Sequence, residues 1–232
     1  MISPNQVLPP LLHGVNNVRS ANNERGLTLI ECLVAIALMG LTAATIAPVM
    51  IFSVATRVQS QKAEQALQLA QGEVEKIRLM VSRGGDYSTE LAEYPVTTAG
   101  SVSDTGPPTS SQANLSSTTT NIAKDINIDS DDDNEFAIQV FRSAGVQPAG
   151  SPVPIAFEIG VRVYDARAMQ NNSANLQTEA ASLGFTSGEG NRGTRPLAVL
   201  YADIFQGDRN DALCEYRQYL DSTASTTGIN CS

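Results

Sequence analysis

Residues 25–56 read RGLTLIECLVAIALMGLTAATIAPVMIFSVAT, and this stretch decides how the chain is organised. Between Glu31 and Arg57 lie 25 residues without a charge. As an α-helix, with a rise of about 1.5 Å per residue, the run would be roughly 37 Å long, enough to cross a hydrocarbon core of about 30 Å. A buried helix of a globular core is the alternative, but such helices rarely run so long without a polar face. The run therefore predicts a membrane-spanning helix over residues 27–56.

The helical pattern continues beyond the apolar run. Apolar residues recur at steps of three and four, the period of one helix face: Ala63, Ala66, Leu67, Ala70, Val74, Ile77 and Val81. Arg83-Gly84-Gly85 is a helix stop signal. We therefore predict one helix from Leu27 to Arg83. Its second half, within the amphipathic segment 57–85, needs a sheet or a neighbouring helix to cover the apolar stripe.

Residues 86–232 contain strand patterns and form the predicted head. The clearest alternation runs from Ile155 to Tyr164. Further strands are predicted at Phe136–Arg142, Leu197–Gln206 and Leu213–Leu220. Residues 165–196 look like a long connection with one short helical turn at Leu176–Leu183. The fold class predicted is α+β, with one long N-terminal helix packed on a small antiparallel sheet.

A Ser/Thr-rich segment, residues 97–121, interrupts the head. Its composition, with Gly106-Pro107-Pro108 inside it, predicts a flexible loop. A plain solvated loop and an O-glycosylated one both fit this composition.

Glu31 is the candidate functional residue of the apolar run. A carboxylate inside a membrane span is costly and calls for a partner. The alternative is that Glu31 lies at the level of the lipid headgroups.

The segment Arg25-Gly26-Leu27-Thr28-Leu29-Ile30-Glu31 resembles the cleavage and methylation motif of type IV pilin and pseudopilin precursors. The resemblance implies that a prepilin peptidase cuts between Gly26 and Leu27, removes the cytoplasmic leader 1–26 and methylates the new Leu27 amine. Glu31 then becomes the fifth mature residue, the position of the family's assembly glutamate. The leader is longer than in many pilins, and Leu27 replaces the commoner Phe or Met.

Two further residues support the resemblance. Gly40 and Pro48 are residues 14 and 22 counted from Leu27, where many type IV pilins carry Gly and Pro. A proline inside a helix removes a backbone donor, so we expect a kink at Pro48. The expected fold is thus pilin-like, with a long kinked helix.

The resemblance implies a structural role. The chain would be a minor type IV pilin or pseudopilin, a single-pass protein of the plasma membrane with its head outside the cytoplasm, assembled into a short filament for secretion or motility. Its expected partners are the prepilin peptidase, other pilins and an inner-membrane assembly platform. Residues 54–59 and 62–73 look similar to cyanobacterial pseudopilins linked to hormogonium polysaccharide secretion. The alternative is a membrane-anchored binding module that never assembles.

Three cysteines and an acidic run remain. Cys32 lies in the span and is most simply a small apolar residue. The resemblance implies a disulfide between Cys214 and Cys231 in the extracytoplasmic head; two free thiols are the alternative. The acidic run contains oxygen ligands suited to calcium: Asp129, Asp131, Asp132, Asp133 and Glu135. It departs from the EF-hand pattern, and a solvated acidic loop without a metal is expected.

Charge and histidine content argue against other function classes. Fifteen Lys+Arg against 24 Asp+Glu give a formal net charge of −9, which disfavours a nucleic-acid surface. The single histidine, His13, lies in the predicted leader. A mature chain without histidine cannot form a His-dependent triad or a His-bearing zinc site. We therefore predict neither enzyme activity nor a cofactor.

Overall fold

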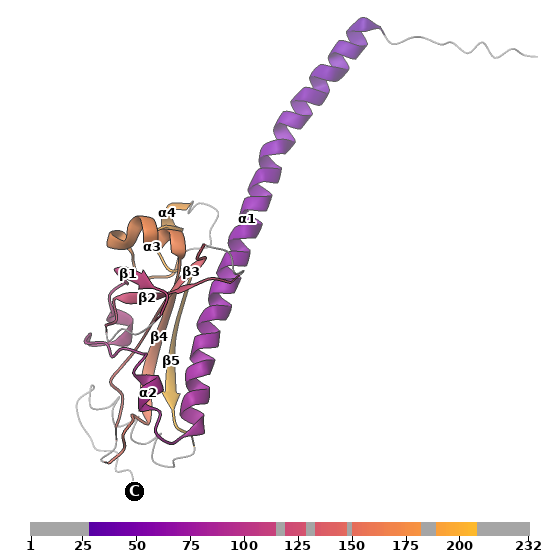
Figure 1. Cartoon of the computed structure of the whole chain (residues 1–232). Helices are drawn as coiled ribbons and strands as arrows, with labels where there is room; N and C mark the ends of the chain where they lie inside the picture. The colour runs from indigo at the N-terminus through magenta and orange to yellow at the C-terminus, as the bar shows by residue number, and fades with distance from the viewer. Residues whose placement is uncertain (1–27, 115–118, 129–132, 148–149, 182–188, 208–232) are drawn as a thin grey trace, which may run out of the picture. The chain divides into compact units, whose positions relative to one another are not determined.

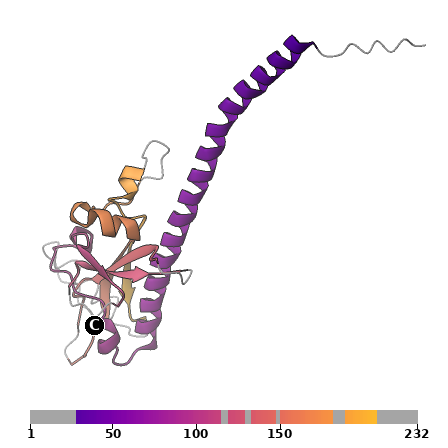
Figure 2. The ribbon, with the colours of Figure 1, turned by 45° about the horizontal axis from the view of Figure 1, so that its top comes forward.

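The computed structural model describes residues 28–114, 119–128, 133–147, 150–181 and 189–207. The chain divides into two compact units, residues 1–51 and residues 52–232. Figure 1 shows the elements, and Figure 2 gives a second view of the same ribbon. The first unit contributes only helix to the described chain, whereas the second contains the sheet.

The first element is α1, Leu29–Arg83. Gly84 and Gly85 follow it with φ angles of 66° and 78°, which glycine adopts without steric cost, so the helix ends at the predicted stop. An apolar window of α1 has a mean hydropathy of 2.2, and none of it is buried. By length and composition this helix can cross a membrane.

The sheet of the second unit has five strands in the order β1-β2-β3-β4-β5. Their bounds are Ser110–Gln112 (β1), Ile122–Ile126 (β2), Phe136–Arg142 (β3), Ala156–Asp165 (β4) and Ala198–Phe205 (β5). All neighbouring pairs are antiparallel except β1 and β2, which are parallel. Val161 in β4 pairs with Val140 in β3 and with Leu200 in β5, at the centre of the sheet.

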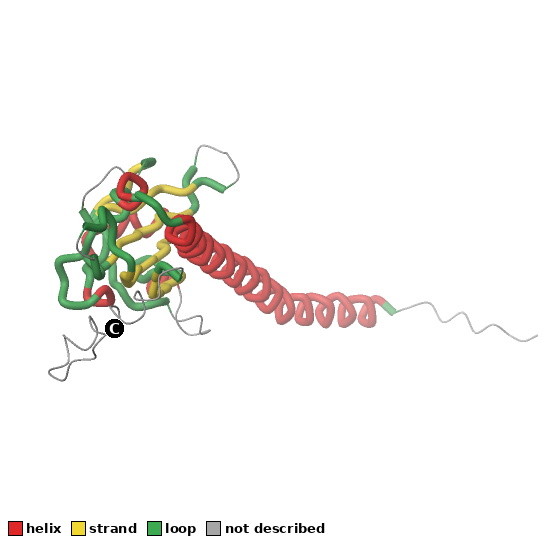
Figure 3. The backbone as a smooth tube through the Cα atoms, turned by 90° about the horizontal axis from the view of Figure 1, so that it is seen from below, coloured by secondary structure: helices red, strands yellow, loops and turns green. Residues whose placement is uncertain are grey.

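One face of the sheet packs against the C-terminal half of α1. The strands gather on one side of this half of the helix in Figure 3. The buried helix residues are Ala63, Ala66, Ala70, Val74, Ile77, Met80 and Val81. They meet the inward-facing side chains of β4, among them Phe157, Ile159 and Val161, in the main core. This is the α+β, pilin-like arrangement that the sequence predicts.

The helix face differs from the prediction at two positions. Leu67 is 43% exposed, although its spacing placed it on the apolar face, and Met80, which the predicted face did not include, is buried. Leu67 follows Ala66, which is fully buried, and adjacent helix positions point about 100° apart. At this turn of α1 it is Ala66 that is buried, while Leu67 lies outside the buried face.

The opposite face of the sheet is covered by loops and short helices. This face carries α3 (Ala166–Asn172) and the 3₁₀ turns η1 (Val102–Asp104) and η2 (Ser173–Asn175). Two further short helices are α2 (Ser88–Leu91), whose Leu91 belongs to the main core with α1, and α4 (Glu189–Arg192). Tyr164, Ala168 and Met169 contribute to a second, smaller core on this face. Gly160 lies against the ring of Phe141, where an added Cβ would come within 2.5 Å of the ring.

Three of the predicted strands agree with β3, β4 and β5 to within one residue at each end. The fourth, Leu213–Leu220, lies outside the described residues. The predicted helical turn at Leu176–Leu183 is wrong over its described part, because residues 176–181 are not helical. The described α-helices of this connection are α3 and α4 instead. Helix α3 begins where Asp165 accepts a hydrogen bond from the backbone N–H of Arg167.

The Ser/Thr-rich segment also contributes structure that its composition did not predict. It includes η1, β1 and the buried side chains of Val102 and Thr105. This segment therefore covers part of the sheet face that α1 leaves open.

Candidate functional site

Thr28 and Glu31 form a capping box at the start of α1. The backbone N–H and the hydroxyl of Thr28 both donate to Glu31 Oε2, each at 3.0 Å. In return, the backbone N–H of Glu31 donates to Thr28 Oγ1 at 3.3 Å. A Thr at the N-cap and a Glu three residues later satisfy backbone donors that a helix start otherwise leaves free. The negative carboxylate also complements the positive end of the helix dipole.

Three threonines of the apolar run bond back to the helix itself. Thr42 donates to Met39 O at 2.9 Å, and Thr45 donates to Thr42 O at 2.8 Å. Thr56 donates to Phe52 O and Ser53 O at the end of the run. Hydroxyls bonded back to their own helix are compatible with a lipid environment, where water is absent. Cys32 is a free, exposed thiol on this helix.

The start of α1 lies within a known sequence motif. Residues 21–47 match the family model described as the prokaryotic N-terminal methylation motif. The chain carries a type IV prepilin-like cleavage and methylation motif. No curated protein and no solved structure matches the chain significantly.

The motif includes every predicted residue of the processing site. Gly26 and Leu27, which flank the expected cut, lie outside the described residues. Glu31 is described and exposed. Pro48, just beyond the matched residues, lies within α1, which continues through it. The position of the cut, the methylation of Leu27, the assembly role of Glu31 and the kink at Pro48 remain predictions.

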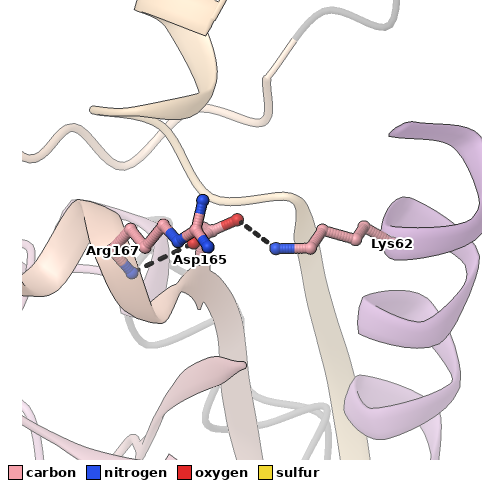
Figure 4. A network of polar contacts seen from close by, with 3 residues as sticks. All are labelled: Lys62, Asp165 and Arg167. Atoms are coloured by element: carbon pink, nitrogen blue, oxygen red, sulfur yellow. Dashed lines mark hydrogen bonds and ion pairs between the residues drawn. The ribbon is translucent and has the colours of Figure 1, made fainter. Parts of the chain in front are cut away.

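A second polar site joins α1 to the sheet in the head. Lys62 Nζ lies 3.0 Å from Asp165 Oδ2, across 103 residues of sequence. The other oxygen of Asp165 accepts the backbone N–H of Arg167 at 3.0 Å and so caps α3 (Figure 4). One carboxylate thus fixes both the helix α1 and the start of α3. The sequence did not indicate this pair, because nothing in the spacing of Lys62 and Asp165 brings them together.

Among the described residues of the head, Arg162 in β4 is a charged residue whose side chain is fully buried. Its guanidinium donates to the carbonyl oxygens of Thr105 at 2.6 Å and Ser103 at 2.9 Å, and to the hydroxyl of Tyr201 at 2.9 Å. The ring of Phe141 lies 4.8 Å from the guanidinium carbon. A buried cation is tolerated only when its donors are satisfied, and here the Ser/Thr-rich segment provides the oxygens.

The described part of the acidic run forms a turn between β2 and β3. Glu135 Oε2 accepts the backbone N–H of Ile128 at 2.7 Å, and the carbonyl of Asp133 accepts from the Asn127 amide at 3.0 Å. The described residues contain no group of three or more side chains placed to hold a metal ion. Asp129, Asp131 and Asp132 lie outside the described residues, as do Cys214 and Cys231.

Proposed function

We propose that this chain is the precursor of a minor type IV pilin or pseudopilin, a structural subunit rather than an enzyme. The observation that carries the proposal is the methylation motif at residues 21–47, which opens directly into a 55-residue helix. The head supports it, because the small alanine face of α1 packs on a mostly antiparallel sheet.

In the proposed pathway, a prepilin peptidase cuts after Gly26 and methylates the amine of Leu27. The mature chain then stays in the plasma membrane through the segment 27–56, with the head outside the cytoplasm. An assembly platform draws it into a short filament with other pilins, for secretion, including secretion of polysaccharide, or for motility.

Glu31 has a defined chemical role in this pathway. Its carboxylate pairs with the cationic amine of Leu27 on a neighbouring subunit, inside a bundle of apolar helices from which water is excluded. Removing one partner of an ion pair that is shielded from water leaves an uncompensated charge and is strongly destabilising. The pair therefore sets the register of the subunits. Pro48 leaves the carbonyl one turn before it without its helical donor, which gives the packed helix a point of bending.

The proposal extends to the C-terminal cysteines. In an oxidising compartment Cys214 and Cys231 form a disulfide that closes a short loop of the head. A loop of about 15 residues contributes roughly 3 kcal/mol in the chain-entropy treatment. The bond would be excluded if reduction leaves the mass of the chain unchanged and both thiols can be alkylated.

The decisive experiment is the intact mass and N-terminal sequence of the protein purified from native membranes. We expect a chain that begins with N-methylated Leu27. A retained leader, or a cut after Thr56, would contradict the pilin proposal. Either result would instead favour a membrane-anchored or secreted binding module.

A further inference from the structure

A cavity of about 310 Å³ lies in the head, where α1 meets α3 and α4. Its charged lining residues are Lys62, Asp165, Arg167 and Arg192. Three cations thus face one carboxylate, in a chain whose formal net charge is −9. The lining of the cavity is therefore positively charged, although the chain as a whole is negatively charged.

The two arginines are the uncompensated charges of this cavity. Lys62 and Asp165 neutralise each other at 3.0 Å (Figure 4). Within the described residues, neither the exposed Arg167 nor the half-buried Arg192 forms an ion pair with a carboxylate. Guanidinium groups bind phosphate and carboxylate oxygens through paired, charge-assisted hydrogen bonds.

The excess of positive charge is confined to one side of the Lys62–Asp165 pair. A neighbouring cavity of about 220 Å³ shares Lys62, Asp165 and Arg167 but is also lined by Asp133 and Glu135. Carboxylates therefore outnumber cations there. Of these two cavities, the one that includes Arg192 favours an anionic ligand.

The wall that α1 contributes to this cavity begins immediately after the apolar run. Val58 lines the cavity and is the second residue after Thr56, and Lys62 follows one turn later. At about 1.5 Å per residue, Lys62 lies roughly 9 Å beyond the end of the run along the helix. The headgroup layer on each side of a bilayer is on the order of 5–8 Å deep. The α1 wall of the cavity, from about 3 Å beyond the run at Val58 to about 9 Å at Lys62, therefore lies at the level of the headgroups and just outside them.

We propose that this cavity binds the phosphate headgroup of an anionic phospholipid of the membrane that anchors α1. Arg167 and Arg192 hold the phosphate oxygens, and Asp165 positions Arg167 by capping α3. The inference rests on the membrane anchoring proposed above and is independent of filament assembly.

The test uses the full chain, purified in mild detergent and exposed to an equimolar mixture of phosphatidylglycerol and phosphatidylcholine. Retained lipids are then counted by native mass spectrometry. We expect preferential retention of phosphatidylglycerol by the wild type. Because a cation near an anionic lipid surface contributes about a fivefold preference, the double variant R167Q/R192Q should lose about 25-fold. The control is R78Q/R195Q, which removes two positive charges that already pair with Glu75 and Glu179.

Three results would overturn the inference: equal retention of the two lipids by the wild type, an unchanged preference in R167Q/R192Q, or an equal loss in the control. Displacement of the lipid by millimolar inorganic phosphate would also overturn it, because the site would then select a free anion. Flotation of the full chain with pure phosphatidylcholine vesicles after an alkaline wash tests anchoring separately. A chain that floats without lipid preference refutes this inference alone, whereas one that does not float refutes the proposed anchoring.

Discussion

At the scale of single residues, the capping box shows that Glu31 has a structural role within its own chain. Its carboxylate accepts two hydrogen bonds from Thr28, so a loss of function in Glu31→Ala would not separate a lost helix cap from a lost charge. The amide of glutamine can still accept at this position of a capping box, but it carries no charge.

A pair of substitutions separates the two roles. Glu31→Gln keeps an acceptor for the cap and should reduce the assembled fraction in sheared filament preparations to the level of Glu31→Ala. Thr28→Ala removes the hydroxyl of the cap but leaves the charge, so assembly should stay near that of the wild type. If Glu31→Gln assembles normally and Thr28→Ala does not, Glu31 is a helix cap and not an intersubunit partner.

A second residue pair gives a prediction about pH. Glu158 in β4 lies opposite Asp203 in β5, and burial, with a smaller contribution from the Asp203 charge, raises the pKa of Glu158 above its usual range. The folded state therefore binds this proton more tightly than the unfolded state. Glu158 makes its full contribution to the free energy of unfolding at pH values below its ordinary pKa. This contribution is lost as the pH rises through the raised pKa of the folded state.

Glu158→Gln should therefore increase the free energy of unfolding at pH 7, by less than about 1 kcal/mol because the group is partly exposed and screened. The gain should vanish near pH 4. Urea denaturation of the full chain in detergent, followed by circular dichroism at both pH values, checks this. Glu64→Gln, at an exposed position of α1, is the matched control and should change stability at neither pH. A gain of equal size at both pH values would contradict the explanation.

At the scale of elements, the contact between α1 and the sheet depends on small side chains. Ala66 and Ala70 are fully buried in the main core, among larger apolar side chains of the sheet. Ala70→Leu should destabilise the head by about 1–3 kcal/mol, because the added carbons have no space in a packed core. Leu67→Ala, at a neighbouring exposed position, should change stability by less than about 0.5 kcal/mol. Urea unfolding of both variants tests this, and equal effects would refute the packing shown.

The elements also show how far the sequence could predict the fold. The period of α1, its stop at Gly84-Gly85 and the strict alternation in β4 are local patterns, and each was predicted closely. β1, β2 and α3 were missed, because short elements with polar residues give no periodic signal and depend on tertiary contacts. The motif around Glu31 was recognisable by its resemblance to type IV pilin precursors, because its residues are contiguous in the sequence. The Lys62–Asp165 pair was not, because only the folded chain brings these residues together.

At the scale of the whole molecule, the two units have different requirements. None of the apolar window of α1 is buried, whereas the head has a core of its own. The first unit therefore needs lipid or neighbouring helices, and the second folds around its sheet. This division predicts that the head lies on one side of the membrane only.

A reporter fusion tests this topology. Alkaline phosphatase, which is active only outside the cytoplasm, should be active when fused after Ser232. The same enzyme fused after Gly26, before the apolar run, should be inactive. Activity of the second fusion and inactivity of the first would reverse the proposed orientation.

The order of synthesis gives the alanine face of α1 a further consequence. Helix α1 precedes in the chain every strand that covers it, and the last of these strands ends at Phe205. At about 5–20 residues per second, the interval between synthesis of Arg83 and of Phe205 is on the order of ten seconds. During that time the helix face has no sheet to pack on. The alanines in the first part of this face, Ala63, Ala66 and Ala70, expose little apolar area, so this part of the nascent helix has a low tendency to aggregate before its sheet is made.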